Sequence, residues 1–120
     1  MKTDGAGTLS FGSAPGSTNR INVSSNSYTY SSTGNHDIIL VSVTSSEAVT
    51  ITLPIASAIN NIVDIVDAAG NAGTNNITIV PNANETIVGE TTLVINADYN
   101  SVTLYPNGST SWLIIWVITA

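Results

Sequence analysis

The sequence predicts an all-β domain, a compact antiparallel β-sandwich or small barrel of about eight or nine short strands with an extended N-terminal arm. Three observations support this fold class. Asn, Gly and β-branched residues dominate, and no long stretch keeps the 3.6-residue period of a helix. Short runs of alternating apolar and polar residues recur along the chain. Turn residues separate these runs about every eight to twelve residues.

The expected strands follow one another along most of the chain. They cover residues 27–32, 37–43, 48–53, 61–68, 76–80, 85–89, 91–97, 100–105 and 111–119. The third run, AVTITL, alternates cleanly and ends at Pro54, which cannot donate a hydrogen bond to a sheet. Residues 55–63 allow at most one turn of helix. The tetrapeptide at 106–109 contains Asn-Gly and predicts a hairpin turn between the last two strands.

The last expected strand is apolar on both faces. Alternation places Trp112, Ile114, Trp116 and Ile118 on one side and Leu113, Ile115 and Val117 on the other. Two explanations are open: the strand is central and covered by its own chain, or its second face packs on neighbouring subunits. We favour an oligomer interface made by Leu113, Ile115 and Val117, because a chain of 120 residues has little to spare for two covered faces.

Residues 1–26 differ in composition from the rest, and we place a domain boundary between this arm and a β-domain at 27–120. The arm is rich in Gly, Ser, Ala, Thr and Asn. Its large apolar side chains are Leu9, Phe11, Ile21 and Val23. A segment of this kind needs a surface to lie on. We therefore expect these four residues to anchor the arm on a neighbouring protein.

The charge content excludes several classes of partner. Charged residues make up 8% of the chain, where roughly 25% is usual. The net charge is −6, and Lys2 and Arg20 are the two basic residues. Nucleic acids and anionic membranes attract basic patches, so we expect neither as a partner. There is no cysteine, so the fold contains no disulfide.

Three small groups of polar residues could carry chemistry. They are His36 with Asp37, Asp64 with Asp67 and Asn71 (Asn75 and Asn76 follow), and Glu85 with Glu90. No Gly-x-Ser-x-Gly motif supplies a nucleophile. Asp64 and Asp67 are three apart on an expected strand, so they point to opposite faces and do not converge on a metal ion. We therefore expect no enzyme activity, no cofactor and no bound metal, and assign these residues to turns.

A series of short motifs resembles a known domain. The series comprises Thr52-Leu53-Pro54, the stretch from Asp67 to Ile79, Ile87-Val88-Gly89, the stretch from Tyr99 to Tyr105, and Trp112. In this order the motifs resemble a small β-domain of tailed-phage appendage proteins, which include tail fibres, head fibres and capsid-decorating proteins. The resemblance covers residues 28–120. It implies a virion protein without enzymatic activity, commonly a homotrimer.

Together these observations lead to one functional hypothesis and one alternative. The hypothesis is a capsid decoration (cement) protein on the outer capsid surface, whose partners are the major capsid protein and itself as a homotrimer. A cement protein needs only an arm, whereas a fibre tip needs a shaft. The alternative is a tail-fibre or head-fibre adhesin that binds host polysaccharide, with Tyr28 and Tyr30 forming an aromatic ridge on one strand face.

Overall fold

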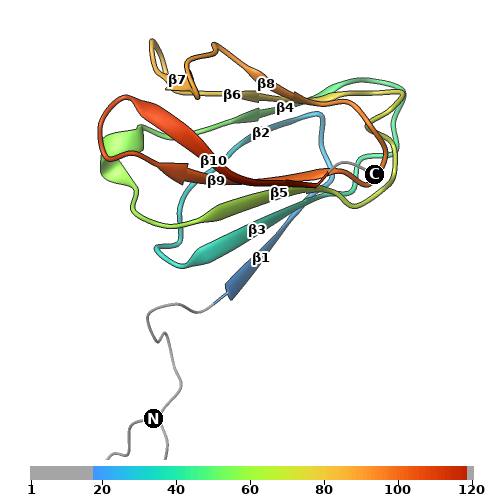
Figure 1. Cartoon of the computed structure of the whole chain (residues 1–120). Helices are drawn as coiled ribbons and strands as arrows, with labels where there is room; N and C mark the ends of the chain where they lie inside the picture. The colour runs from blue at the N-terminus through green and yellow to red at the C-terminus, as the bar shows by residue number, and fades with distance from the viewer. Residues whose placement is uncertain (1–17, 119–120) are drawn as a thin grey trace, which may run out of the picture.

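The computed structural model describes residues 18–118, and these residues form ten strands and one turn of 3-10 helix (Figure 1). The strands are β1 (Thr18–Val23), β2 (Ser27–Thr29), β3 (His36–Val41), β4 (Val49–Thr52), β5 (Val63–Asp67), β6 (Ile77–Val80), β7 (Thr86–Ile87), β8 (Leu93–Ile95), β9 (Ser101–Pro106) and β10 (Ser111–Ile118). The helical turn η1 spans Ala56–Ala58. The all-β prediction is confirmed. Within the described range, no helix has the length and hydrophobicity needed to cross a membrane.

The sheet topology differs from the predicted antiparallel sandwich. Successive strands from β1 to β6 alternate between two sheets, so that β1, β3 and β5 are parallel neighbours in one sheet and β2, β4 and β6 in the other. The complete orders are β1-β3-β5-β9-β10-β7 and β2-β4-β6-β8 (Figure 1). The chain therefore winds as a β-solenoid of three coils. Antiparallel pairing occurs where β8, β9 and β10 close the structure.

Unequal coils explain why the sequence shows no internal repeat. Thr18 pairs with His36 in the next coil, 18 residues further along the chain. Val49 pairs with Ile77, which is 28 residues further along. Residues that stack in the structure thus have no constant spacing in the sequence. A period-2 pattern also looks the same in parallel and antiparallel strands, so alternation alone could not reveal the solenoid.

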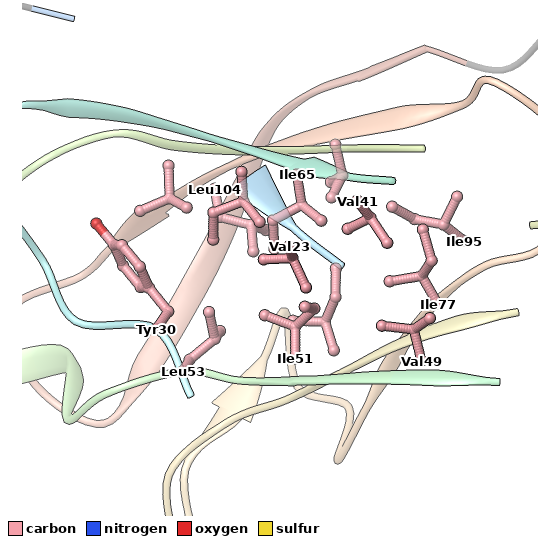
Figure 2. Packing of buried hydrophobic residues seen from close by; sticks show 14 of the residues in the cluster. Val23, Tyr30, Val41, Val49, Ile51, Leu53, Ile65, Ile77, Ile95 and Leu104 are labelled. Atoms are coloured by element: carbon pink, nitrogen blue, oxygen red, sulfur yellow. The ribbon is translucent and has the colours of Figure 1, made fainter. Parts of the chain in front are cut away.

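Stacked aliphatic residues fill the space between the two sheets (Figure 2). Ile39 pairs with Ile65 in one sheet, and Ile51 pairs with Ile79 in the other, and all four side chains are fully buried. In Figure 2, Val41 and Ile65 point toward the side chains of the opposite sheet. Parallel, in-register stacking places like residues above one another, which gives a continuous core from short strands.

The first strand lies inside the region assigned to the arm. β1 pairs with β3 along its whole length, from Thr18 to Val23. Val23 is 2% exposed, and Ile21 packs against the core. Val23 is thus a core residue and is not available for the contact with a neighbouring protein that the sequence suggested. The other two expected anchors, Leu9 and Phe11, lie outside the described residues.

Candidate functional site: the exposed face of β10

The two outer faces of the solenoid differ in polarity. Positions that point outward from the four-stranded sheet are Ser27, Thr29, Thr50, Thr52, Thr78, Val80 and Val94, as the strand register shows. Most of them carry hydroxyl groups, which suit a surface that faces water. This sheet therefore needs no partner on its outer side.

The outer face of the six-stranded sheet mixes polar positions such as Arg20 and Asp64 with apolar ones. On β3, Ile38 and Leu40 alternate with buried neighbours and point outward, where they are half-buried. Leu40 pairs with Val66 of β5, which is also half-buried. Both strands thus carry apolar side chains on the outer face, beside the polar residues His36 and Asp64. The sheet offers apolar side chains to a surface beyond the chain itself.

The largest exposed apolar group lies on β10, and we call it the β10 patch. Its members and their exposed fractions are Leu113 (43%), Ile115 (48%), Trp116 (64%) and Val117 (58%). Leu113, Ile115 and Val117 are the three residues predicted to form an interface. The structure leaves them uncovered by the rest of residues 18–118, so β10 is not a central strand covered on both faces.

A β-bulge adds Trp116 to the patch. The register between β10 and β9 shifts between Ile114 and Trp116. Trp116 consequently lies opposite Thr103, whose side chain points outward beside Asp64. Strict alternation would have placed Trp116 on the same side as the buried Trp112. A bulge changes the facing of every later residue in a strand, which the sequence pattern does not reveal. Val117 therefore lies opposite the buried Val102 and points to the inner side of the sheet, so the prediction that it shares one face with Leu113 is wrong.

The second edge of β10 is open over most of its length. β7 pairs with β10 only at Ser111 and Trp112. Beyond Trp112, no described strand covers this edge. Exposed edges usually carry a charge or proline that blocks pairing with other chains. Residues 111–118 contain neither. Both the edge and the face of β10 are therefore suited to contact with another chain.

The charge distribution permits contact between identical copies at this site. Residues 99–120 contain no charged side chain, although the chain as a whole carries −6. Copies that meet through β10 therefore avoid direct repulsion between like charges. Each patch side chain is about half exposed, so burying Leu113, Ile115 and Trp116 would contribute roughly 2–5 kcal/mol per subunit.

The histidine predicted to be a turn residue forms an ion-pair geometry with a different aspartate. His36 Nε2 lies 2.7 Å from Asp64 Oδ2 on the outer face of the six-stranded sheet. The Thr103 hydroxyl donates to the other oxygen of Asp64. This hydroxyl bonds the carboxylate rather than the imidazole. The arrangement therefore lacks the nucleophile–base contact of a catalytic triad.

Asp67 and Asn71 organise a loop. Asp67 is buried, and its Oδ2 accepts backbone N–H groups from Asn71 (2.9 Å), Ala72 (2.9 Å) and Tyr99 (3.0 Å). Asp64 lies on the opposite face of β5, as predicted. Across residues 18–118, no three His, Asp or Glu side chains gather as metal ligands. Glu85 likewise has a structural role, because it accepts the Ala56 N–H at 3.0 Å.

Tyr30 does not form the predicted aromatic ridge with Tyr28. Tyr30 is 1% exposed, and its hydroxyl donates to Asp37 at 2.5 Å. Burial and this hydrogen bond raise the pKa of Tyr30 well above its ordinary value. Tyr28 is half-buried against the core, and burial raises its pKa as well. Tyr30 is thus not accessible to a glycan, and the alternative hypothesis loses this contact.

The fold and the β10 patch define a β-solenoid domain with exposed apolar side chains on its last strand. The sequence matches the family described as "Bacteriophage T4 gp9/10-like protein, N-terminal" over residues 3–114, and the chain belongs to this family. It is therefore a bacteriophage structural protein, with a place in the virion. No curated protein matches the chain.

Proposed function

We propose that this chain is a capsid decoration protein without enzymatic activity, which assembles with identical copies through the β10 patch and binds the outer surface of the capsid. The observation that carries the proposal is the exposed, charge-free β10 with one open edge. Membership of a phage structural family supports a role in the virion.

A closed trimer is the assembly we propose for the β10 patch. In a ring, the patch of each copy packs on a different surface of its neighbour, and closure covers every patch. The apolar outer positions Ile38, Leu40 and Val66 lie on the same face of the sheet and would extend the buried area. The contact needs no chemistry, because burial of apolar surface supplies the free energy.

Residues 1–17 supply the proposed contact with the major capsid protein. Leu9 and Phe11 remain the anchors in this proposal, since Ile21 and Val23 belong to the folded domain. A trimer would present three such segments to the shell. Several weak contacts on one assembly add up to firm attachment through a high effective concentration.

The oligomeric state tests the first half of the proposal. We expect light scattering after size-exclusion chromatography to give a trimer for the intact chain and a monomer for Trp116→Asp. Thr78→Asp is the matched control, because it adds the same charge on the outer face of the other sheet. A monomer for the unmodified chain, or a trimer that Trp116→Asp leaves intact, would contradict the proposed interface.

Binding to purified capsids tests the second half. Removal of residues 1–17 leaves β1 in place, whereas removal of residues 1–26 would also delete this strand and damage the fold. We expect the shorter deletion, and the double variant Leu9→Ser/Phe11→Ser, to abolish cosedimentation with capsids lacking the protein. Unchanged occupancy, or labelling of virions that places the chain on the tail, would refute the capsid assignment.

A further inference from the structure

We propose that one end of the solenoid carries a binding groove for a neutral saccharide, which meets the β10 patch where Tyr105 pairs with Leu113. Two adjoining hollows open there, with volumes of about 440 Å³ and 280 Å³. They share Gly34, Asn60 and Asn61 as lining residues. The loop between β2 and β3 forms one wall, and the segment that follows η1 forms the other; both lie at the same end of the domain in Figure 1.

Buried side chains hold both walls of the groove in place. Asp37 accepts hydrogen bonds from the Thr33 N–H (3.0 Å) and the Thr33 hydroxyl, which fixes the first wall. The Ser32 hydroxyl donates to Asn61 of the second wall. Asn61 in turn donates to the buried Tyr30 hydroxyl at 3.0 Å. Because the walls are tied to the core, a ligand would bind without the cost of ordering two loops.

The exposed lining of the groove offers hydrogen bonds without charge. Tyr105 donates its hydroxyl to Asn60 Oδ1 at 2.6 Å, which orients the Asn60 amide and leaves its N–H₂ group for a ligand. Asn35 adds a second amide, and His36 adds the ring nitrogen that does not contact Asp64. Amide and hydroxyl groups of this kind match the donors and acceptors of sugar hydroxyls.

The composition of the lining selects neutral sugars. Neither hollow is lined by lysine, arginine or a carboxylate. A phosphate or an acidic polysaccharide would therefore find no lysine or arginine to pair with, and the net charge of −6 would repel it. Ile59, Ile62 and the ring of Tyr105 also line the hollows and supply apolar surface for the C–H groups of a pyranose.

An array of neutral and acidic oligosaccharides, probed with the full chain, tests this inference. We expect retention of neutral members only, followed by measurable binding of the best neutral member in calorimetry. Asn60→Ala and Tyr105→Phe should each weaken that binding about tenfold, since each removes a polar contact of the groove. Asn84→Ala is the control, because it removes an exposed amide outside the groove.

Three outcomes would overturn the inference. They are no retention of any neutral sugar, preferential retention of acidic sugars, and neutral binding that neither groove variant weakens. Asn60 is exposed, so its replacement should leave the fold intact, and circular dichroism of each variant checks this. The oligomeric state of Asn60→Ala should equal that of the unmodified chain, which separates failure of this site from failure of the β10 interface.

Discussion

Replacement of Val88 by asparagine should stabilise the protein. Val88 and Gly89 occupy the centre of a tight turn, where Ile87 and Glu90 exchange two backbone hydrogen bonds of 2.8 and 2.9 Å. The φ angles of the two central residues are 44° and 87°. Two positive φ values define a type I′ turn, for which Asn-Gly is the favoured sequence. A β-branched residue such as valine is a genuine outlier in this conformation.

The size of the effect follows from backbone strain and side-chain exposure. The left-handed conformation costs a β-branched residue about 1–2 kcal/mol, and asparagine adopts it more easily. Val88 is 50% exposed, so its removal forfeits only part of a valine's burial energy. Its N–H donates to Trp112 O at 2.8 Å, a bond that any residue except proline retains. We expect a net gain of about 1 kcal/mol, or about 3–6 °C in Tm.

Urea denaturation followed by tryptophan fluorescence would measure this change, because Trp112 is buried in the folded domain. Val88→Ala is the control: alanine also disfavours positive φ, so it should gain much less than asparagine. Equal stability of the two variants, or a loss of stability in Val88→Asn, would refute the strain argument. If Val88→Asn gains stability while the trimer weakens, the strained valine also contributes to contacts at the start of β10.

Three further changes test the interior of the domain. Asp67→Ala should cost about 3–6 kcal/mol, because three backbone N–H groups lose their acceptor, whereas Asp67→Asn should cost less than half as much; equal losses in urea denaturation would contradict this. Gly70→Ala should cost about 1–2 kcal/mol, because φ is +71° and an added Cβ meets the Tyr99 ring; Tyr99→Ala should rescue only part of this loss, since the backbone strain remains, and full rescue in urea denaturation would contradict the strain argument. The pKa of the Tyr30 hydroxyl is higher in the folded chain than in the unfolded chain. As the pH rises above about 10, the unfolded chain therefore loses this proton at a lower pH than the folded chain does, and the free energy of unfolding should fall. Tyr30→Phe should show a shallower fall between about pH 10 and 12, and an unchanged slope would count against the assignment.

Local patterns in the sequence were sufficient to locate most strands. Each of the nine expected ranges contains a strand, because period-2 alternation and turn residues act over a few neighbours. β1 was missed, since its outward positions, such as Arg20 and Asn22, made the segment resemble a polar arm. The parallel topology was also missed. Which strand pairs with which depends on loops of unequal length, and no local signal encodes that choice.

The candidate interface could be predicted in part. The two-sided apolar pattern of residues 112–118 predicted that Leu113, Ile115 and Val117 share an uncovered face; all three are exposed, but Val117 points to the inner side of the sheet, and the interface itself stays a prediction. Trp116 was placed on the wrong side because a bulge has no reliable sequence signature. No pattern in the sequence predicted the proposed saccharide groove. Its walls come from residues 32–36 and 58–62, which only the coiling of the chain brings together.

The β1 edge of the six-stranded sheet carries a residue that opposes edge pairing, whereas β10 carries none. β1 forms one edge of this sheet. Its exposed face carries Arg20, the one lysine or arginine between positions 18 and 118, flanked by Thr18 and Asn22. A charge of this kind is a common device against edge pairing. β10 has no equivalent residue beyond Trp112. Stacking of β10 on the β1 edge of the next copy would build an open filament, and Arg20 opposes it. The sequence thus discourages pairing of β10 with the β1 edge of the next copy, so the proposed ring must bring β10 against another surface of its neighbour.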